Sequence, residues 1–190
     1  MNHDPMHGDD PLTDEAVVAA TQDWLEKAVI GLNLCPFAKA VHVKRQVRYV
    51  VSQASDEEGL LQDLLHALQL LASADPGDIE TTLLVHPFVL RDFLDYNDFL
   101  DIADAAVEEL GLEGVLQVAS FHPQYQFADS APDDMANFSN RAPFPTLHLL
   151  REDSVDKAVA AFPDADRIYE TNIATLRKLG PEGWKALWRK

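Results

Sequence analysis

Four short apolar segments, separated by longer stretches, constrain the fold of this 190-residue chain most strongly. They cover residues 43–52, 79–86, 115–122 and 146–150. The first alternates apolar residues with Lys44 and Arg48, which is typical of a strand with one solvated face. Apolar residues at spacings of three and four fill the stretches between the first three segments, as amphipathic helices do. A strand, helix, strand, helix, strand order predicts that successive strands are parallel neighbours joined by right-handed crossovers.

Capping and helix-breaking residues indicate where the helices begin and end. Thr13 begins the first helix, which ends near Asn33 because Pro36 cannot continue it. A capping box at Ser55 begins the second, and the turn at 75–78 ends it. Three more are expected: from about Asn97 to Gly111, from Asp153 or Ser154 to Ala161, and from Asp164 or Asp166 to Leu179.

The last strand is free to pair antiparallel, so the expected fold class is α/β: a single-domain sandwich with a four-stranded mixed sheet packed by helices. Residues 13–190 form the expected domain, and the polar residues 1–12 form a disordered tail. The chain has one cysteine and no charged, apolar leader, and its apolar runs fall far short of the ~20 residues that span a bilayer. We therefore expect a cytoplasmic protein without a transmembrane segment.

The net charge of −17 is concentrated in one segment. Residues 49–140 hold eighteen acidic residues and a single base, Arg91. Such a field repels phosphate backbones and anionic membrane surfaces, so we expect no nucleic-acid or membrane partner. The bases outside this segment, including Arg48 and Arg141, are where an anion would bind, unless they serve only to neutralise the acidic segment.

Two of the predicted strands end in the same way, on a histidine followed by a proline. His86 precedes Pro87 and His122 precedes Pro123, and a residue before proline is held extended. If these strands are parallel neighbours, both histidines lie at the carboxyl edge of the sheet, where α/β folds usually bind ligands. They are candidates for a catalytic acid and base in a site open to solvent, or else they cap strands and bond within the core.

His148 lies early in the last strand and would join this edge if that strand runs antiparallel. Three neutral imidazoles at one point suit Zn²⁺ with an open position for water. His86, His122 and His148 are therefore weak metal candidates, because their spacing in the sequence is not specific. The sequence assigns no cofactor.

Cys35 precedes Pro36, and proline is favoured at the first position of a helix. As the N-cap of a short helix, its thiol would lie in a field that favours the thiolate, which makes Cys35 a candidate nucleophile. The apolar neighbours Leu34 and Phe37 favour the alternative, an inert thiol in the core.

Residues 124–144 show no periodicity, and loops of that length are often functional. Pro143 and Pro145 stiffen the end of this loop beside Asn140 and Arg141. A guanidinium held on a rigid loop binds carboxylate or phosphate through two hydrogen bonds. We expect an anion site here, with Tyr125 as a further contact, or an ion pair from Arg141 to an acid of the same loop.

Several well-known motifs are absent from the chain. It has no Gly-x-Gly-x-x-Gly, no Gly-x-x-x-x-Gly-Lys-Ser/Thr, no Gly-x-Ser-x-Gly and no His-Glu-x-x-His. Dinucleotide-binding, P-loop, α/β-hydrolase and zincin assignments therefore lack their signatures.

Three runs of sequence resemble a known family: GLNLCPFA from Gly31, VASFHPQYQF from Val118, and NFSNRAPFPTLHLLRE from Asn137. They closely resemble an uncharacterised bacterial family, domain of unknown function 1415, and the similarity covers nearly the whole chain after the tail. The resemblance implies a bacterial protein of one domain, and it implies no activity, cofactor or catalytic residue. Ala142 stands where family members often have serine.

Three functions stay open. The first is a small soluble enzyme that acts on an anionic small molecule, with Arg141 and Arg48 binding the anion and the histidines transferring protons. The second is a module that binds a ligand or a protein without chemistry, and the third is a structural role for all these residues. Convergence of His86, His122 and Arg141 in one pocket would favour the first.

Overall fold

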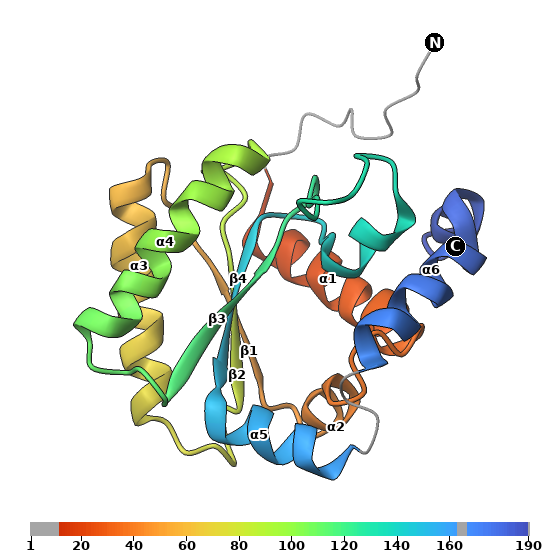
Figure 1. Cartoon of the computed structure of the whole chain (residues 1–190). Helices are drawn as coiled ribbons and strands as arrows, with labels where there is room; N and C mark the ends of the chain where they lie inside the picture. Colours follow the sequence, from red (N-terminus) through yellow and green to blue (C-terminus); the bar gives the residue numbers. More distant parts are fainter. Residues whose placement is uncertain (1–11, 163–166, 190) are drawn as a thin grey trace.

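The computed structural model describes residues 12–162 and 167–189. Within them, four strands form one mixed sheet with helices on both faces (Figure 1), which confirms the predicted α/β fold. The predicted tail at 1–12 lies almost wholly outside the described residues. None of the described helices has the length and apolar character needed to cross a membrane.

The strands are β1 (Val47–Val51), β2 (Thr81–Val85), β3 (Leu116–Phe121) and β4 (Thr146–Arg151). Their order in the sheet is β1-β2-β4-β3. β1 and β2 are parallel, while β4 is antiparallel to both β2 and β3. The expectation that β2 and β3 are neighbours is therefore wrong: β4 returns between them and completes the hydrogen bonds of both. Even so, β1, β2 and β3 run in the same direction and end at one edge.

Two long helices cover one face of the sheet (Figure 1): α3 (Glu57–Ser73) and α4 (Phe93–Glu109). Leucines at 60, 64, 68 and 71 repeat along α3 with helical spacing and are fully buried. They meet Leu84, Leu147 and Leu149 of the sheet and Phe99 of α4 in the largest core cluster. Each such side chain contributes about 1.5–3 kcal/mol on burial.

The other face is covered less completely, by α1 (Asp14–Trp24), which continues as a π-helix η1 (Leu25–Ile30), and by the short α2 (Ala38–Val43). Trp24 packs edge-on against Phe121 of β3, with ring centroids 5.0 Å apart. Beyond them along the chain lie the 3₁₀ helix η2 (Met135–Asn140), α5 (Glu152–Ala161) and α6 (Ile168–Ala186). Gly180, at φ 66°, interrupts α6 where its end was predicted.

Three helix starts differ from the prediction, and in two of them another side chain caps the helix. Asp56, not Ser55, caps α3 by accepting a hydrogen bond from the Gly59 amide at 2.8 Å. Asp92 caps α4 in the same way, so α4 begins at Phe93, four residues before Asn97. α2 begins at Ala38, and its N-cap position is Phe37.

Candidate functional site

The carboxyl edge of β1, β2 and β3 lies at the top of Figure 1, where α4 begins and the loop after β3 crosses over. His86 and His122 follow β2 and β3 directly, as predicted. Both side chains turn toward α4, because their rings contact Tyr96 at centroid distances of 5.7 and 5.0 Å. The two histidines therefore meet at this edge although their strands are not neighbours.

His86 is fully buried, and its Nδ1 donates a hydrogen bond to the Val89 carbonyl at 3.1 Å. A carbonyl only accepts, so the proton of the neutral ring is on Nδ1 and Nε2 carries a lone pair. Nε2 is buried without a hydrogen-bond partner among the described residues. Burial, with a smaller contribution from nearby His122, lowers the pKa of His86 from 6.5 to about 4.

His122 is also fully buried, and both of its ring nitrogens have backbone partners. The Gln124 amide donates to Nδ1 at 3.0 Å, so the proton is on Nε2, which donates to the Leu90 carbonyl at 3.2 Å. Burial lowers the pKa of His122 as well. The ring is therefore neutral at pH 7 and has no free nitrogen for a ligand.

The two imidazoles together hold the loop that leads into α4. Their carbonyl partners, Val89 and Leu90, are adjacent, and Leu90 has φ 55°. That left-handed conformation costs a non-glycine residue about 1–2 kcal/mol, which these hydrogen bonds offset. The expectation that both histidines are open to solvent is wrong, because each ring is drawn inward to satisfy a carbonyl of this loop.

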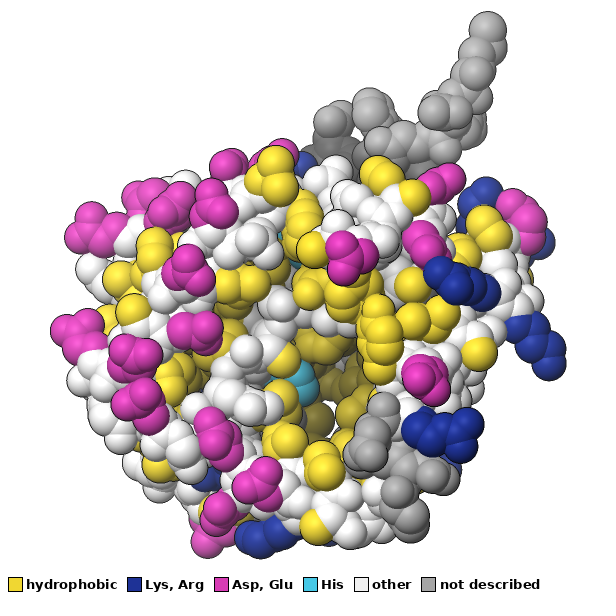
Figure 2. Space-filling view, viewed as in Figure 1, with side chains coloured by type: hydrophobic (Ala, Val, Ile, Leu, Met, Phe, Trp, Pro, Cys, Tyr) yellow, Lys and Arg dark blue, Asp and Glu magenta, His cyan; other side chains and the backbone are white. Residues whose placement is uncertain are grey.

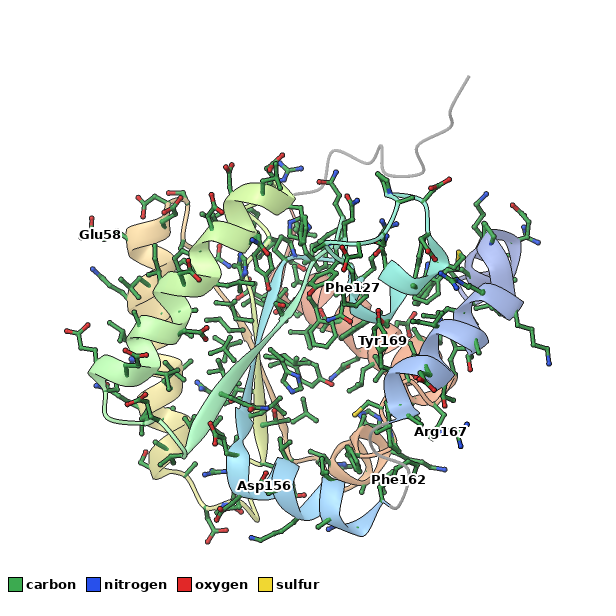
Figure 3. All side chains as sticks on the ribbon, viewed as in Figure 1. Glu58, Phe127, Asp156, Phe162, Arg167 and Tyr169 are labelled. Carbon is green, nitrogen blue, oxygen red and sulfur yellow. The ribbon has the colours of Figure 1, made fainter. Side chains whose placement is uncertain are left out.

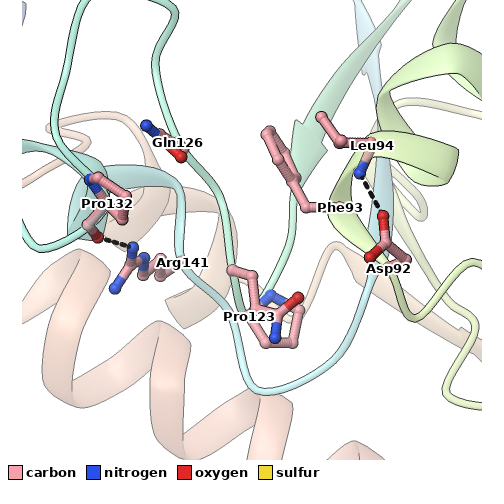
Figure 4. A pocket seen from close by; sticks show the side chains of 8 residues that line it. Asp92, Phe93, Leu94, Pro123, Gln126, Pro132 and Arg141 are labelled. Atoms are coloured by element: carbon pink, nitrogen blue, oxygen red, sulfur yellow. Dashed lines mark hydrogen bonds between the residues drawn. The ribbon is translucent and has the colours of Figure 1, made fainter.

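A pocket of about 420 Å³ lies between this loop and the loop after β3 (Figure 4). Its lining residues are Asp92, Phe93, Leu94, Pro123, Gln124, Gln126, Pro132 and Arg141. Pro123 and Gln124 follow His122, and the ring of Phe93 packs on the His122 ring at 5.5 Å. The histidines thus support the pocket without lining it, whereas Arg141 lines it directly.

Arg141 binds no carboxylate in the part of the chain that the structure describes. Its Nε donates to the Tyr125 carbonyl at 3.1 Å and its Nη2 to the Pro132 carbonyl at 2.6 Å. Its guanidinium carbon lies 4.4 Å from the centre of the Phe138 ring. The predicted ion pair to an acid of the loop does not form: Asp134 pairs with Arg177 instead, at 2.8 Å. Partial burial lowers the pKa of Arg141, which nonetheless stays charged near neutral pH.

These contacts leave three of the five N–H groups of Arg141 available, including one on each terminal nitrogen. Both N–H groups of Nη1 are among them, and an N–H of a charged guanidinium donates well to a carboxylate oxygen. Asp92 lines the same pocket as its one acidic side chain. Its Oδ1 accepts from the Leu94 amide at 2.8 Å and caps α4, while Oδ2 has no hydrogen-bond partner among the described residues. The pocket therefore offers both a cation and an anion to a ligand.

Two further predicted contacts, Asn140 and Tyr125, help to build the pocket loop. The Asn140 amide nitrogen donates to the Ser120 carbonyl at 3.2 Å, which ties η2 to the end of β3. The Tyr125 ring packs on Phe93 at 5.2 Å, and its carbonyl holds Arg141. Neither side chain lines the pocket.

Arg48 and Cys35 do not join this site. Arg48 lies near the start of β1, the edge strand farthest from β3, and its Nη1 is buried without a partner among the described residues. Cys35 packs on the cluster around Trp24, on the opposite side of the sheet from His86. It is partly buried, and it precedes the N-cap position of α2 by two residues.

His148 faces the side of the sheet opposite His86 and His122. In the sheet it aligns with Leu83 and Ala119, and its ring packs on Phe121 at 5.9 Å. The three histidines therefore cannot meet at one metal ion. Within residues 12–162 and 167–189, no cluster of three or more His, Cys, Asp or Glu side chains suits a metal.

Sequence reasoning missed Asp92, Phe93 and Gln126 as lining residues. For Asp92 a signal was present, since an aspartate before an apolar residue is a good N-cap, and a cap at a sheet edge is close to any ligand bound there. Gln126 and Pro132 had no comparable signal, because loop residues without periodicity are placed only by tertiary contacts.

A comparison with family models matches residues 16–186 to a family described as "Protein of unknown function (DUF1415)". Comparisons with curated proteins and with solved structures find no match for this chain.

Proposed function

Since the chain belongs to the DUF1415 family of proteins of unknown function, we propose an activity from its site: the pocket beside Arg141 binds a small anionic molecule. The observation that carries the proposal is the guanidinium of Arg141, which is charged, half-buried and without a carboxylate partner among the described residues, and whose Nη1 donates to none of them. A half-buried guanidinium loses hydration, and a ligand carboxylate would replace it.

The chemistry of the pocket narrows the ligand further. A carboxylate on Arg141 leaves the other end of the ligand facing Asp92, whose Oδ2 accepts hydrogen bonds. An amino group suits that end better than a second anion, which Asp92 would repel. The ligand class that we propose is therefore a small aminocarboxylate, with its apolar part against Phe93 and Pro123.

A thermal-shift series tests this proposal: glycine, β-alanine and 4-aminobutyrate present a carboxylate with an amino group at increasing distance, and acetate presents the carboxylate alone. A ligand at 100 times its Kd stabilises a protein by about 2.7 kcal/mol, which raises the Tm of a chain of this size by about 5–10 °C. We expect at least one aminocarboxylate to exceed acetate. If none of the four raises the Tm, the proposal fails.

Variants separate ligand binding from loop clamping, because Arg141 also holds two carbonyls. Arg141→Gln should lower the Tm and also abolish the shift that the ligand causes. Arg177→Gln removes an exposed arginine whose partner, Asp134, is close in sequence to Arg141, and it should keep the full shift. A shift that persists in Arg141→Gln would reduce Arg141 to a clamp.

A second candidate function is an enzyme that acts on the same anionic ligand, with His86 as a base. One observation favours it: Nε2 of His86 is a buried lone pair without a partner among the described residues, close to His122. For proton transfer, the wall made by Phe93 and Pro123 must open far enough for the ligand to reach His86. Conversion of a bound aminocarboxylate by wild type and not by His86→Asn, followed by mass spectrometry, would select the enzyme over the binding module.

The bacterial origin and the cytoplasmic location expected from the sequence also remain part of the proposal. Cell fractionation with an antibody against the chain tests the location.

A further inference from the structure

The face of the sheet opposite α3 and α4 is hollowed between β3 and α6, above α5 (Figure 2). Side chains of β3 and β4 that point to this face are only partly covered: Ala119, Phe121 and His148 are neither fully buried nor exposed. Hydrophobic side chains, yellow in Figure 2, make up much of the visible surface of this hollow. The helices on this side therefore leave part of the sheet open.

Phe127, Tyr169 and Phe162 lie on the helical side of the hollow (Figure 3). Phe127 and Tyr169 meet edge to face with ring centroids 5.8 Å apart, and Phe37 and Phe162 do so at 6.1 Å. Tyr169 is 55% exposed although it is a large aromatic residue. An open space lined by aromatic rings suits a flat apolar ligand.

His148 supplies a polar group whose tautomer can be deduced. The Thr81 hydroxyl donates its one proton to the Leu149 carbonyl at 2.6 Å, so toward His148 Nε2, at 2.8 Å, it accepts. The His148 proton is therefore on Nε2, and Nδ1 carries a lone pair. Nδ1 has no hydrogen-bond partner within residues 12–162 and 167–189, and His148 itself is partly exposed.

We propose that this hollow is a second binding site, for a small uncharged aromatic molecule that donates a hydrogen bond to Nδ1 of His148. The ring of the ligand would stack beside Phe121, whose centroid is 5.9 Å from that of His148. His148 lies on the face of the sheet opposite His86 and His122, whereas the Arg141 pocket lies at the carboxyl edge, so the two sites are distinct.

The neutral ring of His148 disfavours an anionic ligand. Burial lowers the pKa of His148 to about 4, so the ring stays neutral at pH 7 and Nδ1 keeps its lone pair. A carboxylate placed against a lone pair would lose its hydration without gaining a hydrogen bond. A hydroxyl or amide N–H gains that bond.

Three matched probes test the proposal: phenol has the ring and the donor, toluene has only the ring, and benzoate has the ring with a charge. Binding is followed by NMR from the backbone amides of Ala119 and Phe121 and from the Nδ1 resonance of His148. One hydrogen bond is worth about 0.5–1.5 kcal/mol, so we expect phenol to bind roughly 2- to 13-fold more tightly than toluene. Benzoate should bind more weakly than toluene at this site.

His148→Phe removes the acceptor and keeps a ring, and it should make phenol and toluene bind equally. His66→Phe, at an exposed position of α3, is the control and should keep the preference of wild type. The wild-type comparison stands even if His148→Phe fails to fold. Equal affinity of phenol and toluene in wild type, no binding of phenol, or phenol shifts confined to other parts of the chain would overturn the proposal.

Discussion

His86 should make the stability of the fold depend on pH well above the range in which carboxylates titrate. In the native state its ring is neutral and buried, with a pKa of about 4, whereas in the unfolded chain it titrates near 6.5. As pH falls below 6.5, the ring at position 86 becomes protonated in the unfolded chain but stays neutral in the native protein. The contribution of His86 is therefore fully present above pH 6.5 and is lost as pH falls toward 4.

The magnitude follows from the two pKa values. Over the whole interval, the difference between 6.5 and about 4 corresponds to about 3 kcal/mol. Between pH 7 and pH 5, where only part of the titration occurs, the loss is about 2 kcal/mol. His122 and His148, whose pKa values burial also lowers, change stability in the same direction.

Urea unfolding at a series of pH values between 7 and 5 measures this effect. His86→Asn retains a donor near Nδ1 for the Val89 carbonyl but does not titrate, so its stability curve should be flatter than that of wild type by about 2 kcal/mol over this interval. His66→Asn, at an exposed position of α3, is the control for the loss of a histidine. Parallel curves for wild type and His86→Asn would refute the reasoning.

Three further outcomes are expected. Tyr96→Phe leaves the buried Thr146 carbonyl without its 2.8 Å hydrogen bond, so it should lower the free energy of unfolding in urea by about 1–3 kcal/mol. Tyr169→Phe, at an exposed position, is the control and should lower it by less than 0.5 kcal/mol. Arg151→Met leaves three backbone carbonyls without their shared donor and should lower stability by about 2–4 kcal/mol, which calorimetry would detect as a lower Tm. Cys35 should react with iodoacetamide no faster than a cysteine model compound, because it does not occupy a helix N-cap; faster labelling, read by intact mass, would restore it as a nucleophile.

The strands were predictable because their apolar runs have strand length and end at prolines or turns. Their order was not, because the pattern of one strand does not specify its neighbour. β4 lies between β2 and β3 only because the loop after β3 returns across the carboxyl edge. That loop has no periodicity from which its path could be deduced.

In the candidate site, too, some features were predictable from the sequence and others were not. The sequence placed His86, His122 and Arg141 near one edge, because strand ends and a proline-stiffened loop are local features. It could not say that the histidine rings turn inward to the carbonyls of Val89 and Leu90, since those contacts depend on a left-handed residue in the loop. The face of His148 follows from strand register, which the sequence alone does not provide.

The central claim, that Arg141 binds the carboxylate of a small ligand, is tested most directly by calorimetric titration. The aminocarboxylate that stabilises wild type most would be titrated into wild type, Arg141→Lys and Arg177→Gln. Charged hydrogen bonds are worth about 1.5–3 kcal/mol, so we expect a roughly 10- to 150-fold loss of affinity in Arg141→Lys, which keeps the charge but not the planar guanidinium. Arg177→Gln should stay within about twofold of wild type. Equal affinities in wild type and Arg141→Lys would contradict the claim.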